Sequence, residues 1–274
     1  MKKILIGILI LVIGFIGYLF FFGKLFPYSS VILGFEKHEL TNTIFYTQKG
    51  VSFNDYEKID TLIPGVEKFH DLRYLRKPKL FLYYDSISYL RHSPSRARFC
   101  TFYNGRIFLT PWALNEARNG KISLEIYLAH ELSHSLLHQH SGLINAIKYP
   151  EWLLEGIAVY SSNQMGTSFY PGKNETYRLI QSGNFMPPHY YKTKNEDKIN
   201  LDLENRIPFM YSEFACIVDY LISKYGKQEF LTYIKAIARG NNHNKIFRQV
   251  FEINFDEFLI DFKDYVLNDG KTEA

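Results

Sequence analysis

The sequence lacks the features that identify cysteine-dependent proteins. Its 274 residues include only two cysteines, Cys100 and Cys216, and no Cys-x-x-Cys pair. This argues against a thiolate zinc site and against a dithiol redox motif. The two thiols either form one disulfide or stay free, and the sequence leaves both possibilities open.

Strong charge and repetition are also absent. The net charge is only +4, and no basic cluster is interleaved with aromatic residues, so we expect no nucleic-acid partner. No internal repeat or low-complexity tract stands out. By contrast, 46% of the residues are hydrophobic and 17% are aromatic. That is ample for the core of one large domain or of two lobes.

One long hydrophobic run is present, at residues 4–23, and it contains no charged residue. Twenty residues at about 1.5 Å each match the roughly 30 Å hydrocarbon core of a bilayer. The run is longer than the apolar part of a signal peptide, and no small-x-small cleavage site follows it. We therefore predict that residues 1–26 form an uncleaved transmembrane signal anchor, with a cleaved signal peptide as the alternative.

The charges that flank this run suggest its orientation. Lys2 and Lys3 precede it, and Lys24 follows it. This weak bias favours a cytoplasmic N-terminus. The protein would then be a single-pass protein of the cell membrane, with its main domain on the extracytoplasmic side.

After a linker over residues 27–42, the sequence predicts one α+β domain over residues 43–274. A small sheet and a long helix would fill it to about residue 148, and a mostly helical lobe would begin at about residue 149. Strands are expected at 43–47, 79–84 and 106–110, and helices at 54–69, 86–91, 176–182, 210–224, 228–238, 245–251 and 255–267. The strand at 106–110 follows an Asn-Gly turn signal. It is either an edge strand that can hold an extended peptide or an ordinary sheet strand.

The most informative motif is His-Glu-x-x-His, in which His130, Glu131 and His134 lie on a predicted helix between Ser123 and Gly142. Successive helical residues turn by about 100°, so the two histidines lie about 40° apart, one turn from each other. Two imidazoles so placed can share one metal ion, and Glu131 can reach a water molecule activated there. The alternative is a helix with ordinary surface histidines.

A second segment, residues 150–160, supplies a carboxylate. Glu155 lies in the middle of this apolar stretch with no Lys or Arg within one turn. A buried carboxylate is costly unless it is paired or binds a metal. Glu151, at the start of the helix, is better explained by the helix dipole. Glu155 is therefore the expected third ligand, although an exposed glutamate on an amphipathic helix is the alternative.

Two imidazoles and one carboxylate suit a catalytic zinc ion, which takes three protein ligands and keeps one position for water. We therefore predict one Zn²⁺ per chain, held by His130, His134 and Glu155. Glu131 would act as general base, taking a proton from the attacking water and passing it to the leaving amine.

At these residues the chain resembles a known family. His130-Glu131-Leu-Ser-His134 with the later Trp-Leu-Leu-Glu155-Gly-Ile-Ala is similar to the gluzincin metallopeptidases, especially their peptidase-MA-like, often membrane-bound bacterial branch. The resemblance implies a zincin-like fold, in which a small sheet with an edge strand and an active-site helix face a helical C-terminal lobe across a cleft. It also implies the same three zinc ligands and the same general base.

The chain departs from the family in two places. It has no Gly-x-Met-Glu-Asn motif, which argues against aminopeptidase activity. Ala158 and Val159 replace the Ser-Asp of the thermolysin-type Glu-x-x-Ser-Asp pattern. The partner that orients a ligand histidine is therefore unidentified.

The resemblance also implies a tyrosine from the C-terminal lobe that stabilises the oxyanion. Tyr211 is the best candidate, because it follows a proline-containing loop at the expected start of a helix. His189, in a loop, is a second candidate donor. His138 and His140 are expected to be ordinary polar residues near a helix end.

These features predict a membrane-anchored zinc metallopeptidase, an endopeptidase acting on peptide or protein substrates. A non-catalytic binding or assembly protein of the cell envelope is one alternative, although the intact Glu131 argues against it. A zinc hydrolase with a non-peptide substrate is another, because the cleft and not the zinc selects the substrate.

Overall fold

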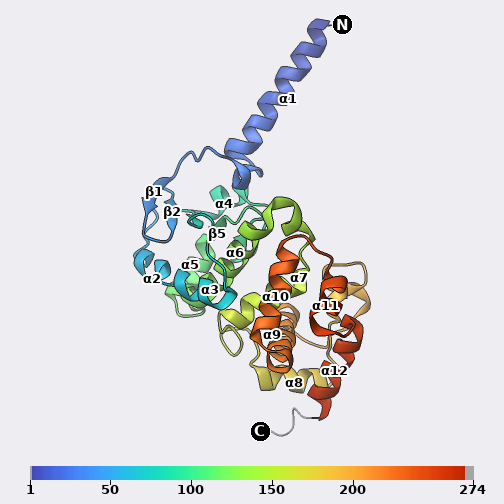
Figure 1. The fold of residues 1–274 in the computed structure, drawn as a ribbon. Coiled ribbons are helices and arrows are strands. Elements are labelled where there is room, and N and C mark those ends of the chain that lie inside the picture. The colour runs from blue at the N-terminus through green and yellow to red at the C-terminus, as the bar shows by residue number, and fades with distance from the viewer. Residues whose placement is uncertain (1, 269–274) are drawn as a thin grey trace.

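The computed structural model describes residues 2–268, which form an α+β fold (Figure 1). The strands are β1 (Glu36–Glu39), β2 (Ile44–Thr47), β3 (Lys79–Leu82), β4 (Phe99–Thr101) and β5 (Ile107–Leu109). The helices are α1 (Lys2–Phe22), α2 (Tyr56–Asp60), α3 (Ile63–His70), α4 (Ser86–His92), α5 (Pro111–Arg118), α6 (Leu124–Lys148), α7 (Glu151–Ser161), α8 (Lys173–Gln181), α9 (Arg206–Tyr225), α10 (Lys227–Ala238), α11 (His243–Phe251) and α12 (Phe255–Asn268). Short 3-10 turns are η1 (Phe26–Tyr28), η2 (Pro188–Tyr190) and η3 (Glu196–Lys198). The predicted α+β class is confirmed at this level.

The sheet is small and mixed, with strand order β1-β2-β3-β5-β4. β2, β3 and β5 are parallel, and the antiparallel strands β1 and β4 form its two edges. Side chains alternate between the two faces, so Leu80 and Leu82 pack with α6 while Phe81 joins an aromatic cluster on the other face. The strand predicted at 106–110 is therefore the interior strand β5. The edge strand beside α6 is β4.

The segment predicted as a linker, residues 27–42, is largely folded against the sheet. It contains most of η1 and the strand β1, which pairs with β2. Just before it, Phe26 is fully buried, with its ring 5.9 Å from that of Phe81 and 4.1 Å from that of His92. The linker prediction is wrong here because the outer face of the sheet is apolar, and this segment helps to remove it from water. No periodic pattern in residues 27–42 reveals that role.

The helix α1 stands apart from the body of the protein (Figure 1), and none of its residues is buried. With 21 residues and a mean hydropathy of 2.9, it is long and apolar enough to cross a membrane. A signal sequence near the N-terminus has the same properties. Only residues 23–25 separate α1 from the packed turn η1.

The second half of the chain folds around α7 and α9, which share an apolar core. These helices pack closely at Gly156, since an added Cβ there would lie 2.7 Å from the carbonyl oxygen of Phe214. Real Cβ atoms do not approach another atom so closely, so this packing requires glycine. The contact fixes α9 next to Glu155, the residue before Gly156.

Most predicted helices are present with shifted ends. The helix predicted at 54–69 is divided into α2 and α3. α5 is absent from the sequence prediction although its signals are regular. Thr110 accepts a hydrogen bond from the backbone N–H of Ala113, and Pro111 occupies the first helical position.

Candidate metal centre

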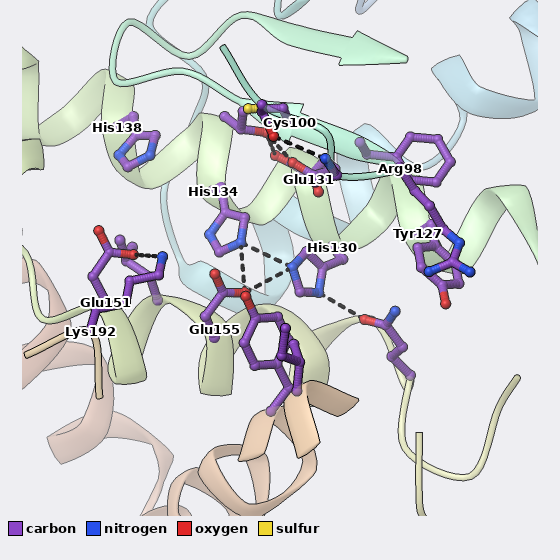
Figure 2. A pocket seen from close by; sticks show the side chains of 18 of the residues that line it. Arg98, Cys100, Tyr127, His130, Glu131, His134, His138, Glu151, Glu155 and Lys192 are labelled. Carbon is purple, nitrogen blue, oxygen red and sulfur yellow. Dashed lines mark hydrogen bonds and ion pairs between the residues drawn. The ribbon is translucent and has the colours of Figure 1, made fainter. Parts of the chain in front are cut away.

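The helix α6 carries both motif histidines and begins where predicted. The hydroxyl of Ser123 accepts a hydrogen bond from the backbone N–H of Ile126, which caps the helix. At Gly142 the backbone reaches φ +65° and the helix breaks before a short second segment. The face toward the sheet is apolar and includes Leu128, Leu132 and Leu136. His130 and His134 face α7 instead (Figure 2).

The helix α7 places one carboxylate opposite these two histidines (Figure 2). Glu155 is buried, as expected for a ligand and not for an exposed helical glutamate. Its Oε2 lies 3.3 Å from Nε2 of His130 and 3.4 Å from Nε2 of His134. The two Nε2 atoms are 3.0 Å apart. The three atoms therefore form a nearly equilateral triangle.

This triangle fits a metal ion. A tetrahedral centre with metal–ligand bonds of about 2.0–2.1 Å has edges of about 3.3–3.4 Å between ligand atoms. The observed separations of 3.0, 3.3 and 3.4 Å are close to those edges. The buried group of His130, His134 and Glu155 could therefore hold one metal ion.

Electrostatics keep Glu155 charged inside this site. Burial disfavours the carboxylate, but the adjacent His134 and His130 imidazoles hold the pKa of Glu155 well below its usual range. Burial likewise disfavours the charged form of His134, and Glu155 outweighs that effect and raises the pKa of His134. A carboxylate beside two imidazoles is a ligand set that suits a divalent cation.

The side chain that orients His130 is Gln164, which the sequence does not reveal. Its Oε1 accepts a 2.8 Å hydrogen bond from Nδ1 of His130, and this leaves Nε2 of the neutral ring free to bind a metal. Gln164 is fully buried just after α7. It lies 34 residues from His130, so no local pattern connects the two. The buried Nδ1 of His134 has no hydrogen-bond partner within residues 2–268.

Glu131 points away from Glu155, toward β4 (Figure 2). Its Oε2 accepts a 2.6 Å hydrogen bond from the hydroxyl of Thr101. Its side chain lines the same cavity as the three metal-binding candidates. The fold thus brings the two histidines and the two glutamates of the predicted site together. Thr101 is an additional polar contact, and its short strand carries no motif that could have identified it.

The cavity has a volume of about 470 Å³ and lies between β4, α6, α7 and α9. The strand β4 contributes Phe99, Cys100 and Thr101 to its wall. Because β4 is the last strand of the described sheet, its outer edge can pair with an added strand. Lys192 and Glu151 also line the cavity and form an ion pair of 2.9 Å.

Tyr211 also lines this cavity, from the second turn of α9 and not from the helix start that was predicted. Its ring is nearly parallel to that of His130, with centroids 6.4 Å apart. Its hydroxyl accepts a 3.2 Å hydrogen bond from Tyr191. Burial raises the pKa of Tyr211 well above its usual value, so the hydroxyl keeps its proton at neutral pH.

The other histidines near the motif lie outside the ligand triangle. His138 lines the cavity with its ring 6.3 Å from that of His134, and burial lowers its pKa to about 3. His140 contacts the carbonyl oxygen of Arg73 at 2.8 Å. His189 lies in η2 and does not line the cavity.

Both cysteines are free thiols, which decides the choice that the sequence leaves open. Cys100 is half-buried on β4, and Cys216 is buried on α9. Burial raises the pKa of Cys100 to about 12, so this thiol stays protonated at neutral pH.

Similarity to known proteins does not define the function. No family model matches the chain, and no curated protein matches it. What the chain does must therefore be inferred from its own geometry.

Proposed function

We propose that this protein is a membrane-anchored zinc metallopeptidase, an endopeptidase with a gluzincin-type site in a zincin-like fold. One observation carries this proposal. The ligand atoms of His130, His134 and Glu155 converge within 3.4 Å of one another, in a cavity that also contains Glu131 and an edge strand. The resemblance of His130-Glu131-Leu-Ser-His134 to the gluzincin motif supports it.

His130, His134 and Glu155 would hold one zinc ion, and Gln164 would fix the ring of His130. Two histidines and one glutamate are the protein ligands of several catalytic zinc sites. When bound, zinc polarises a carbonyl group and makes water a stronger nucleophile near neutral pH.

The side chains that line the cavity beside the three ligands carry out the proton transfer and stabilise the developing charge. Glu131 accepts a proton from water as the water oxygen attacks the carbonyl carbon of the peptide. The same carboxyl group then gives this proton to the amine nitrogen as the C–N bond breaks. Thr101 holds the carboxyl group in place through its 2.6 Å hydrogen bond. Tyr211 donates a hydrogen bond to the carbonyl oxygen as negative charge develops there.

The edge strand β4 would bind the substrate. A peptide in an extended conformation can add to this edge by main-chain hydrogen bonds. Its backbone would then cross the cavity beside Glu131. The helix α1 would anchor the enzyme in the cell membrane with the cavity on the extracytoplasmic side.

The test is a Glu131→Gln variant of the full chain in detergent, supplied with zinc. Zinc content measured by mass spectrometry should stay at one ion per chain, since Glu131 is not a ligand. Hydrolysis of a peptide library should fall by about 10²–10⁴-fold, the usual contribution of a general base. Glu125→Gln is the matched control, because Glu125 lies on the same helix but does not line the cavity. It should keep both zinc and activity.

Two results would contradict the proposal. Equal turnover in the parent and in Glu131→Gln would exclude this mechanism. A parent chain that takes up no zinc would exclude the metal site, and a non-catalytic binding role in the cell envelope would then be the better explanation.

A further inference from the structure

A second cavity, of about 240 Å³, is lined by basic side chains. Four of its lining residues are Arg76, Lys77, Lys79 and Arg106, and no acidic residue lines it. We call these four residues and the space between them the basic cavity. It shares no lining residue with the candidate metal centre.

Most of this positive charge is not neutralised. Lys77 is paired with Glu39, with Nζ 3.1 Å from Oε1. Arg76 and Arg106 donate to backbone carbonyl oxygens, and within residues 2–268 neither they nor Lys79 forms an ion pair. Burial, followed by the nearby charges of Arg106 and Arg76, lowers the pKa of Lys79. The basic cavity therefore favours an anion.

The basic cavity lies at the foot of α1. Tyr28, the last residue of η1, and Ser30 line it, and only residues 23–27 separate Tyr28 from the end of α1. The turn η1 is held firmly in this position. The side-chain amide of Asn104 donates a 2.6 Å hydrogen bond to the carbonyl oxygen of Pro27.

Two segments that each follow a lining residue of the basic cavity along the chain carry exposed apolar side chains. Val31 and Leu33, just after Ser30, are 45% and 44% exposed. The last segment of α6, beyond Gln139 in the cavity wall, exposes Leu143 (50%), Ile144 (71%) and Ile147 (57%). These three lie at i, i+1 and i+4, on one side of the helix. In Figure 1 this yellow-green end of α6 lies at the same end of the body as the base of α1.

We propose that these exposed apolar side chains and the basic cavity form one face, and that this face rests on the bilayer that α1 enters. The basic cavity then holds the phosphate of an anionic lipid headgroup. Basic and apolar side chains on one face are typical of surfaces that lie in the membrane interface. Each Lys or Arg near an anionic surface contributes roughly a fivefold gain in binding. The exposed apolar side chains of residues 31–33 and 143–147 enter the region of the acyl chains, while the basic cavity faces the headgroups. This inference requires α1 in a membrane but does not require catalysis.

The first experiment measures contact with lipid. An Ile144→Trp variant of the full chain is reconstituted in vesicles of phosphatidylcholine and phosphatidylglycerol, and its fluorescence is quenched with brominated lipid. Ile260→Trp is the matched control, because Ile260 is 61% exposed on α12, which lies at the far end of the body (Figure 1). Quenching of Ile144→Trp should exceed the quenching of the parent chain. Quenching of Ile260→Trp should equal that of the parent chain. Equal quenching in the two variants, in chains that float with the vesicles, would refute the membrane contact.

The second experiment tests the basic cavity. In the Ile144→Trp chain, brominated phosphatidylglycerol should quench more strongly than brominated phosphatidylcholine at the same dilution. Adding Arg76→Gln and Lys79→Gln should abolish this excess. Adding Arg178→Gln on α8 and Lys227→Gln at the start of α10 removes two charges from exposed positions elsewhere and should preserve it.

Two outcomes would overturn the headgroup assignment. In one, the excess survives Arg76→Gln and Lys79→Gln. In the other, inorganic phosphate abolishes the excess at matched ionic strength, which would make free phosphate the ligand. Peptide hydrolysis in detergent does not depend on this face, so failure here and failure of the proposed peptidase activity are distinguishable.

Discussion

The helices α6 and α7 face each other across the buried group of His130, His134 and Glu155. They differ in how many polar side chains they contribute to the site. α6 presents a polar side with two histidines and a glutamate, and it packs the other side on the sheet. α7 is buried over nearly its whole length and contributes one carboxylate, Glu155. A polar face such as that of α6 can be recognised from residue spacing alone. A single buried charge is recognised from the cost of burying it.

The largest effect is expected on the α7 side, where one residue carries the whole contribution. Glu155→Ala should reduce zinc content from one ion per chain to near zero, because two imidazoles alone leave the site short of a ligand. Glu151→Ala, on the same helix, should retain zinc. Metal analysis of the full chain in detergent checks both. Retention of zinc in Glu155→Ala would show that the α7 carboxylate is not a ligand.

A smaller effect is expected on the α6 side from the partner of His130. Gln164→Leu removes the hydrogen bond at Nδ1 and should weaken zinc affinity by about 10–100-fold, the usual cost of losing such a contact. Gln164→Glu keeps an acceptor oxygen and should retain most of the affinity. Competition with a zinc-binding dye measures it. Equal affinity in Gln164→Leu and the parent would mean that packing alone orients His130.

The close packing of α7 on α9 gives a third test. Gly156→Ala places a methyl group 2.7 Å from the carbonyl oxygen of Phe214, and it should destabilise the fold by about 1–3 kcal/mol. Gly65→Ala in α3 has no atom within 4 Å of the new Cβ and should change stability little. Thermal unfolding compares the two. Equal melting temperatures would mean that α9 can shift without cost.

The smallest effect concerns a buried polar contact between α3 and α6. His70 contacts the hydroxyl of Ser133 at 2.9 Å, and burial lowers its pKa to about 4. In the unfolded chain the His70 imidazole takes up a proton near pH 6.5, whereas in the folded chain it does so only near pH 4. The free energy of unfolding therefore decreases as pH falls from about 6.5 toward 4. His70→Gln should flatten this part of the stability curve. An unchanged slope of melting temperature against pH would show that other groups dominate.

The helical part of the site is predictable from the sequence because its members are close together. His130, Glu131 and His134 share one helix, so geometry follows from their spacing. Glu155 is predictable because its neighbours are apolar. Gln164 and Thr101 are not, because each meets its partner only through tertiary contacts at separations of 34 and 30 residues.

The elements of the fold also differ in how well the sequence predicts them. Long amphipathic helices such as α9 and α12 follow from their periodicity, with ends shifted by a few residues. The strand β1 escapes prediction because its four residues, Glu36–Glu39, are mostly polar and exposed. Its place depends on the edge of β2. The same holds for Phe26, whose burial depends on a sheet face formed by residues far along the chain.

The locked turn η1 has a mechanical consequence for a protein held by α1. Residues 23–25 are too few to act as a flexible tether, and Lys24 is itself bonded to the carbonyl oxygens of Leu90 and Ser93. In the membrane-anchored enzyme proposed above, the fold would therefore hold the cavity at one fixed distance from the bilayer. Substrates would be selected by how far their cleavage sites stand from the bilayer as well as by their sequences.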